Sequence, residues 1–122
     1  MLQNDFFHIT DLQSADNTIT ATVEIDPAHS IFEGHFPGQP VVPGVCMMQM
    51  VKEITEQHLG KATNLLKADQ IKFLTVLIPG ESGPLRMDLK YNTREDGATG
   101  IDAQLLNDIT VFFKFKGLFV IS

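Results

Sequence analysis

A cluster of prolines and glycines followed at once by an uninterrupted apolar run is the feature that most constrains this chain. Both lie within Gly34–Glu53, which reads GHFPGQPVVPGVCMMQMVKE. Pro43 suits a helix start, because its ring fixes φ and its missing N–H would have no partner there. Neither proline nor glycine follows Gly44 until Gly60, a typical C-terminal stop. The pattern therefore predicts one long helix from Gly44 to about Leu59.

The first two turns of the predicted helix are apolar on nearly every side, and only Gln49 interrupts them. A helix of this kind has to be covered by other parts of the protein. The chain has 122 residues, of which 43% are hydrophobic, and this is the size and composition of one domain with a substantial core. We therefore expect a single domain, residues 1–122, built around this helix.

Charge and cysteine content narrow the possible partners and setting. The formal net charge of −6 disfavours nucleic acid and an anionic membrane surface as partners. The single cysteine, Cys46, lies in the apolar run, which excludes an intrachain disulfide and fits a reducing compartment. Because we find no signal peptide and no long apolar span, we expect a cytoplasmic protein outside the membrane. Neither metal-ligand spacing nor a glycine-rich phosphate loop occurs, so no metal or cofactor is expected.

Five segments have the character of β-strands. They are Ile19–Ile25, Ile71–Ile78, Leu85–Tyr91, Ile101–Leu105 and Thr110–Ile121. Most of them alternate apolar and polar residues, as half-buried strands do, whereas the β-branched and aromatic run Ile71–Ile78 predicts a well-buried strand. Residues 5–11 fit a short helix or an edge segment equally well. The predicted fold is α+β, with one antiparallel sheet curled around one long central helix.

A single sheet around one helix leaves a sheet edge or a helix flank uncovered. The chain also contains nine phenylalanines and five methionines, which is many for its length. We therefore expect part of this apolar surface to be buried by a second copy of the chain, in a homo-oligomer.

The segment that begins at Gly34 resembles the active-site segment of the β-hydroxyacyl-(acyl-carrier-protein) dehydratases of fatty acid synthesis. The pattern of that family is approximately G-H-F-P-x-x-P-V-x-P-G-V, followed by a carboxylate on the helix. The positions that agree in register are Gly34, His35, Phe36, Pro37, Pro40, Val41, Pro43, Gly44 and Val45. The later segment IKFLTVLIPGES resembles a strand of the family that ends in Pro-Gly-Asp. The resemblance covers most of the chain and implies the hotdog fold.

The resemblance also implies roles for individual residues. His35 would be the base that takes the α-proton of a 3-hydroxyacyl thioester borne on acyl carrier protein. A backbone N–H of Gly44 or Val45 would hold the thioester carbonyl, and Phe36 would contact the substrate. Unpaired N–H groups and the positive end of a helix dipole stabilise the developing enolate oxygen. In the dimers of this family, the site is shared between subunits.

Position 49 departs from the family pattern. The family has a carboxylic acid 14 residues after the histidine, donated by the partner subunit, and this chain has Gln49. A glutamine amide can donate a hydrogen bond but cannot give up a proton to a leaving hydroxyl at neutral pH. Glu53 lies one turn further on the same helix face and is an alternative source of the acid. In the other interpretation, Gln49 and Glu53 belong to an ordinary polar stripe with Lys52 and Glu56.

Three functions are compatible with these residues. The first is a dehydratase that eliminates water from 3-hydroxyacyl thioesters. The second is a non-catalytic acyl-binding subunit, which could pair with an active paralogue. The third is an acyl thioesterase, in which a polar helix residue would position water. Gln49 weakens the first and permits the others, whereas His35 and Gly44 are needed only by the first, which we favour.

Overall fold

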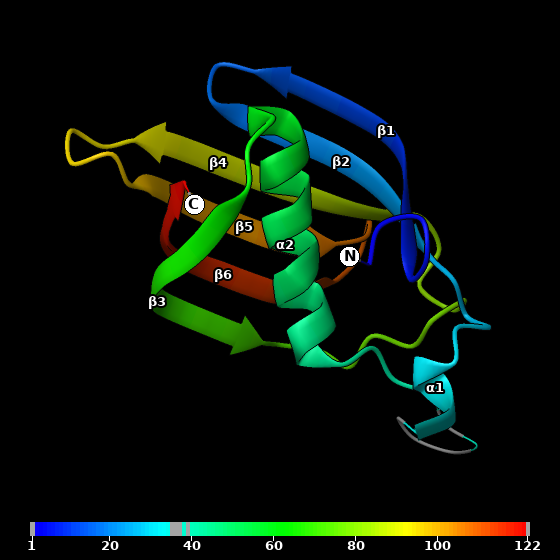
Figure 1. The fold of residues 1–122 in the computed structure, drawn as a ribbon. Coiled ribbons are helices and arrows are strands. Elements are labelled where there is room, and N and C mark those ends of the chain that lie inside the picture. Colours follow the sequence, from blue (N-terminus) through cyan, green and yellow to red (C-terminus); the bar gives the residue numbers. More distant parts are fainter. Residues whose placement is uncertain (1, 35–37, 39, 122) are drawn as a thin grey trace.

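The computed structural model describes residues 2–34, 38 and 40–121, and in them six strands form one antiparallel sheet with a long helix across one face (Figure 1). The strands are β1 (Phe7–Ala15), β2 (Thr18–Ile25), β3 (Thr63–Phe73), β4 (Leu85–Thr93), β5 (Thr99–Leu106) and β6 (Val111–Ile121). The helices are α1 (Ile31–Gly34) and α2 (Gly44–Leu59). The strand order is β1-β2-β4-β5-β6-β3, so β1 and β3 form the two edges.

The predicted central helix is confirmed, with the bounds that its proline and glycine signals indicate. Pro43 precedes α2 with φ −64° and an extended ψ of 144°, and Gly60 follows it with φ 70°. Glycine adopts that left-handed conformation without the steric cost that a side chain would add. The Gly60 N–H donates to the Glu56 carbonyl at 2.8 Å and closes the last turn. One face of α2 is buried through the apolar side chains Cys46, Met47, Met50, Val51 and Ile54.

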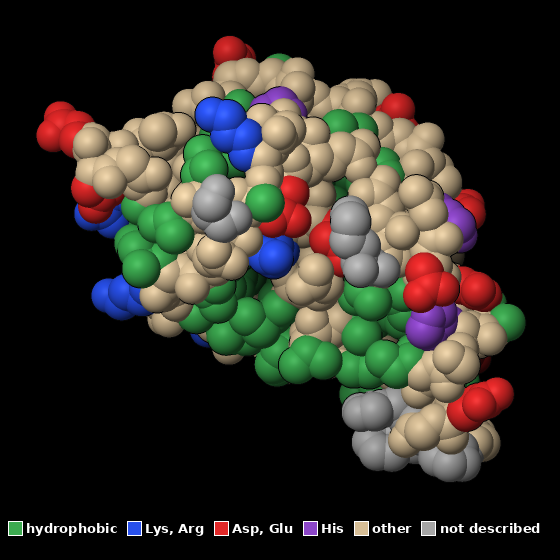
Figure 2. All heavy atoms as spheres, viewed as in Figure 1, with side chains coloured by type: hydrophobic (Ala, Val, Ile, Leu, Met, Phe, Trp, Pro, Cys, Tyr) green, Lys and Arg blue, Asp and Glu red, His purple; other side chains and the backbone are tan. Residues whose placement is uncertain are grey.

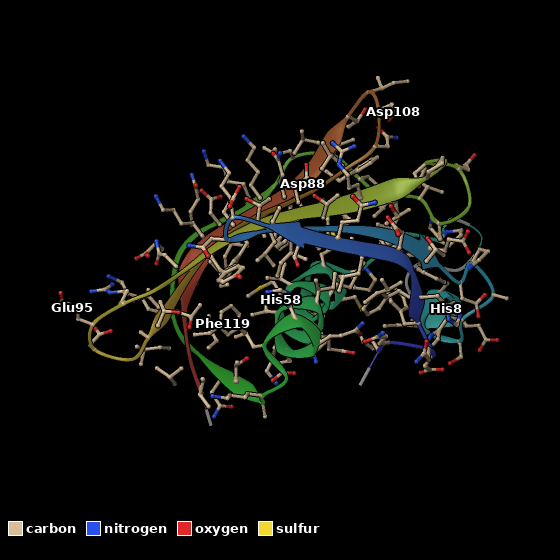
Figure 3. The ribbon with its side chains drawn as sticks, turned by 90° about the horizontal axis from the view of Figure 1, so that it is seen from above. His8, His58, Asp88, Glu95, Asp108 and Phe119 are labelled. Carbon is tan, nitrogen blue, oxygen red and sulfur yellow. The ribbon has the colours of Figure 1, made fainter. Side chains whose placement is uncertain are left out.

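The concave face of the sheet supplies the other half of the core. Alternate residues of the inner strands point toward α2, as the period of two requires. Side chains with no exposed surface include Ile19, Met87, Leu89, Leu105 and Phe113. Seen from above, the sheet curves over α2, with Phe119 on the helix side and Asp88 on the other (Figure 3). The predicted α+β hotdog architecture is therefore confirmed.

The prediction of a well-buried strand at Ile71–Ile78 is wrong. β3 begins earlier, at Thr63, ends at Phe73, and has only its first residue buried. Two register irregularities in its pairing with β6 interrupt the regular alternation of sides. After Phe73 the regular ladder ends. The N–H groups of Leu74 and Thr75 both donate to the carbonyl of Phe112, at 2.9 and 3.4 Å, and the chain then leaves the sheet.

The undecided segment at residues 5–11 belongs to an edge strand. β1 pairs antiparallel with β2 through a tight turn at Asp16 and Asn17, whose φ angles are 51° and 64°. Aspartate and asparagine adopt positive φ more readily than other residues with side chains, and two-residue hairpins require it. The Asp16-Asn17 dipeptide therefore favours a hairpin, and with it a strand rather than a helix, for the residues that precede it. The single turn α1, which buries Phe32, has no predicted counterpart.

The surface over β3 is apolar. Its exposed hydrophobic side chains, Leu65, Leu66, Ile71 and Phe73, are between 40% and 59% exposed. Figure 2 shows hydrophobic side chains gathered over β3 and the start of α2. Across the described parts of the chain, no helix combines the length and hydropathy needed to span a membrane.

Candidate functional site

The start of α2 presents backbone hydrogen-bond donors. The N–H groups of Cys46 and Met47 bond to the Pro43 carbonyl at 3.1 and 3.4 Å. Those of Gly44 and Val45 have no acceptor among the described residues, and no side chain from these residues caps the helix. Such donors, at the positive end of the helix dipole, favour an oxygen that carries negative charge. This is the environment that the family resemblance implies for a thioester carbonyl.

An apolar cleft of about 300 Å³ lies beside these donors. Its lining includes Val41, Val42, Met47, Leu74, Val76 and Leu77. A hydrogen bond of 2.9 Å from the Val42 N–H to the Leu77 carbonyl joins the chain before α2 to the chain after β3. A larger hollow of about 460 Å³ lies on the outer face of the sheet, among polar and charged groups such as Asp88. The cleft at the helix start combines apolar walls with backbone donors that have no acceptor among the described residues, so we take it as the candidate ligand site.

Gly44 allows Phe73 to pack directly on the helix start. A Cβ at position 44 would lie 2.6 Å from two atoms of the Phe73 ring, which is closer than such atoms approach in practice. The ring also stacks on Phe113, with centroids 5.4 Å apart. Phe73 thus forms one wall of the cleft while 56% of it stays exposed. The sequence does not reveal this role, because Phe73 lies in an apolar run that is typical of a buried strand.

Gln49 and Glu53 form a hydrogen-bonded pair on α2. Nε2 of Gln49 donates to Oε2 of Glu53 at 2.9 Å. Gln49 is partly buried, whereas Glu53 is only 1% exposed. An ordinary solvated stripe would leave both side chains in water, so the polar-stripe interpretation is wrong for Glu53.

The carboxylate of Glu53 anchors the N-terminal segment. The Leu2 N–H lies 3.0 and 2.8 Å from its two oxygens, and the Gln3 N–H donates to Oε1 at 2.8 Å. The segment that contains these residues runs beside α2 (Figure 1). With the amide of Gln49, three N–H groups converge on this carboxylate and use both of its oxygens as acceptors. No sequence pattern reveals these contacts, because they join main-chain groups to a side chain 51 residues away.

His35 and Phe36, the predicted base and the predicted substrate contact, lie outside the described residues. The described elements on either side of them are α1, which ends at Gly34, and α2, which begins at Gly44. Their roles therefore stay predictions that rest on the sequence motif.

Two other histidines are engaged in structural contacts. Nε2 of His29 lies 3.1 Å from a carboxylate oxygen of Asp5. Nε2 of His58 lies 3.0 Å from the hydroxyl oxygen of Tyr91. In the described part of the chain, no three His, Cys, Asp or Glu side chains come close enough to hold a metal ion.

Cys46 gives a prediction about reactivity. It is 4% exposed, and burial raises the pKa of its thiol. The folded protein therefore keeps its thiol proton at a pH where the unfolded chain has begun to lose it, and only the thiolate is alkylated. We expect iodoacetamide to modify the native protein at least about tenfold more slowly than the urea-unfolded chain at mildly alkaline pH. Mass spectrometry of the labelled protein measures both rates, and equal rates would contradict the buried placement.

Comparison with known proteins assigns the chain to a family. The ApeI-like family model, described as ApeI dehydratase, matches residues 11–99. The FabZ 3-hydroxyacyl-[acyl-carrier-protein] dehydratase of Lactobacillus helveticus is 27% identical over 107 residues, which cover 82% of this chain and 72% of that protein.

Solved structures of other proteins have the same fold as this chain. The dehydratase heterocomplex ApeI:P from Xenorhabdus doucetiae matches with a TM-score of 0.71 and 22% identity, covering 90% of this chain and 95% of that chain. A hypothetical thioesterase from Streptococcus pneumoniae, solved with coenzyme A, matches with a TM-score of 0.67 and 11% identity, covering 98% and 91%. At these identities the two structures establish the fold alone. The family model, in contrast, spans the motif, α2 and both walls of the cleft, and the chain therefore belongs to the ApeI-like dehydratase family.

Proposed function

We propose that this protein is a dehydratase that eliminates water from (3R)-hydroxyacyl thioesters carried on acyl carrier protein, in the biosynthesis of fatty acids or other acyl chains. The observation that carries the proposal is the start of α2, where the N–H groups of Gly44 and Val45 lie beside an apolar cleft. An acyl thioester needs an apolar space for its chain and donors for its carbonyl oxygen. The family match supports the reaction class.

The proposed reaction begins at the α-carbon. His35 takes the α-proton, and the electron pair moves onto the thioester carbonyl oxygen. The N–H groups at the helix start stabilise this oxygen, and loss of one such donor typically costs about 10²–10³ in rate. The C3 hydroxyl then leaves as the double bond forms, and it needs a proton to depart as water. Gln49 cannot supply that proton, so we expect slow turnover in the wild-type protein.

Two other functions are compatible with Gln49. A glutamine at this position can position a water molecule, which fits a thioesterase. It also fits a subunit that binds acyl chains without converting them. Such a subunit would rely on a different partner chain for the catalytic carboxylic acid. Each alternative keeps the cleft and the helix start but needs no acid on α2.

Incubation with a 3-hydroxyacyl pantetheine thioester, followed by mass spectrometry of the products, separates the three functions. We expect loss of water from the substrate, at a rate that increases with protein concentration. Hydrolysis to the free acid would point to the thioesterase instead. Binding with neither change would point to the acyl-binding subunit.

We further propose that the protein is a homo-oligomer whose copies meet along β3 and share the site. β3 is a sheet edge, and its exposed apolar side chains give that edge the character of an interface. Val45 is 74% exposed at the start of α2, and hydrophobic side chains gather over both β3 and this helix start (Figure 2). A second copy there would cover both the edge and the open flank of α2.

Leu66→Lys is expected to weaken this association. Leu66 is 59% exposed on β3, and an unpaired charge in an interface costs about 2 kcal/mol or more. The dissociation constant should therefore rise at least about 30-fold, as measured by analytical ultracentrifugation. Ile109→Lys is the matched control, since Ile109 is 92% exposed in a turn outside β3. Equal effects of the two variants, or a wild-type monomer at micromolar concentration, would overturn the proposed interface.

We also propose a cytoplasmic setting. A lone buried cysteine fits a reducing compartment, and acyl carrier protein would supply the substrate there. Fractionation of cells that produce the native protein tests this placement.

A further inference from the structure

We propose that Glu53 is a positioning residue that fixes the amide of Gln49 with its carbonyl oxygen outward, so that Gln49 accepts a hydrogen bond from the C3 hydroxyl of the substrate. The identity of that hydroxyl rests on the proposed function. The orientation of the amide follows from the contacts of the two side chains alone.

The hydrogen bond between the two side chains sets the orientation of the amide. Nε2 of Gln49 lies 2.9 Å from Oε2 of Glu53. Only an N–H can occupy that place, because an amide oxygen there would face a carboxylate oxygen with no proton between them. Since the amide is planar, its Oε1 points away from the carboxylate. Among the described residues no hydrogen bond to Oε1 is found, so within this part of the chain Oε1 is the acceptor that the pair leaves for a ligand.

The carboxylate that holds the amide is itself immobilised. Glu53 is 1% exposed, and the N–H groups of Leu2 and Gln3 bind its two oxygens at 2.8 to 3.0 Å. Rotation of the carboxylate would break these bonds inside the protein, where an unsatisfied donor costs about 1–3 kcal/mol. The N-terminal segment, Glu53 and Gln49 thus form one connected and rigid set of hydrogen bonds.

The position of Gln49 on α2 places it between the helix start and this anchor. Val45, Gln49 and Glu53 follow one another at intervals of four residues and share a helix face. Val45 is 74% exposed, Gln49 is partly buried, and Glu53 is covered. Gln49 does not line the apolar cleft, so a ligand whose carbonyl oxygen sits at the helix start would reach Gln49 by extending along the Val45 face.

In this proposal, Oε1 of Gln49 determines which substituent at C3 of the ligand binds favourably. A hydroxyl can donate to Oε1, whereas a 3-oxo group can only accept and would face Oε1 without a proton. We therefore expect a 3-hydroxyacyl ligand to bind more tightly than the 3-oxoacyl ligand, by about three- to tenfold, the value of one partly exposed hydrogen bond. Pantetheine amides, in which nitrogen replaces the thioester sulfur, keep the carbonyl but do not react and are suitable probes.

Glu53→Gln tests the orientation. In this variant the new side chain can keep its oxygen for the Leu2 and Gln3 N–H groups, and it then presents an NH₂ group to residue 49. The amide of Gln49 has to turn over to accept that bond, which places its own NH₂ group outward. The ratio of dissociation constants for the 3-oxo and 3-hydroxy amides, measured by calorimetry, should fall to about one or invert.

Companion variants separate positioning from stability. Glu56→Gln is the matched control, because Glu56 is also a helix carboxylate that accepts a main-chain N–H, that of Thr63 at 2.6 Å. It should lower stability and leave the ligand ratio unchanged. The double variant Gln49→Glu/Glu53→Gln restores an outward acceptor with complementary hydrogen bonds, so the wild-type ratio should return. A ratio that stays at the wild-type value in Glu53→Gln, or no rescue in the double variant, would overturn the proposal.

A second measurement does not depend on the ligand. In ¹⁵N NMR spectra, one side-chain amide proton of Gln49 should exchange slowly with solvent in the wild type and rapidly in Glu53→Gln. Equal exchange in the two proteins would overturn the positioning role. Protection of this proton in a protein that binds neither amide would instead support the positioning role and overturn the proposed function.

Discussion

Replacing Gln49 with glutamate is expected to raise the rate of water elimination by about 10²–10⁴-fold, the usual contribution of a positioned general acid. The new carboxylate would lie where the Gln49 amide now meets Oε2 of Glu53 at 2.9 Å. Two carboxylates at that separation cannot both ionise, so the pair retains one proton near neutral pH. That proton is the one that the departing hydroxyl requires. Steady-state formation of the enoyl thioester measures the gain.

A control for this gain is available on the same helix. Gln57 is exposed near the end of α2, so Gln57→Glu adds the same charge away from the helix start. It should change the rate by less than about twofold, as exposed substitutions away from a site do. An unchanged or lower rate in Gln49→Glu would mean that position 49 is not where the leaving group is protonated.

Replacing His35 with alanine is expected to reduce the rate of elimination by the whole contribution of the base. The α-proton of a thioester is weakly acidic, and a positioned base contributes about 10²–10⁴ in rate. The apolar cleft and the helix-start donors remain, so binding of the unreactive 3-hydroxyacyl amide should change little. The rate of enoyl formation and calorimetric titration measure the two effects on one sample.

A second histidine variant is the control for a non-specific effect of removing an imidazole side chain. His8 is exposed on β1, and His8→Ala should keep the wild-type rate. If His35→Ala keeps full turnover while it binds ligand normally, another group is the base. If it unfolds, the circular dichroism spectrum shows it, and His35→Gln repeats the test with a larger side chain.

The central helix could be predicted because its signals are local. Pro43 and Gly60 act on the backbone at their own positions, and the apolar run between them needs no knowledge of its neighbours. The alternating strands β2, β4 and β5 were predictable for the same reason. Their polar side faces water and their apolar side faces one layer of core.

β3 could not be predicted in this way, because register irregularities and an exposed edge remove the alternation. Its apolar residues Ile71 and Phe73 are exposed in the single chain, although their β-branched and aromatic character predicts burial. Apolar composition does not distinguish a strand that faces its own core from one that faces a second protein. The segment after β3 lines the cleft, and this too depends on long-range contacts.

The sequence marked position 49 as unusual, but it could not show what holds it. Burial of Glu53 depends on the N-terminal segment folding back along α2, and the partners there are main-chain N–H groups common to nearly every residue. The structure thereby changes the role that we propose for Glu53. Both oxygens of its carboxylate accept hydrogen bonds, and one of these bonds comes from the amide of Gln49.

The most direct test of the proposed chemistry is to run the wild-type reaction in D₂O and follow the 3-hydroxyacyl pantetheine thioester by mass spectrometry. A base and oxyanion donors without a general acid should exchange the α-proton faster than they release water. We therefore predict that recovered substrate gains deuterium at C2 before enoyl product accumulates, and that His35→Ala abolishes both. Substrate that stays undeuterated and unchanged, or is hydrolysed to the free acid, would contradict the account.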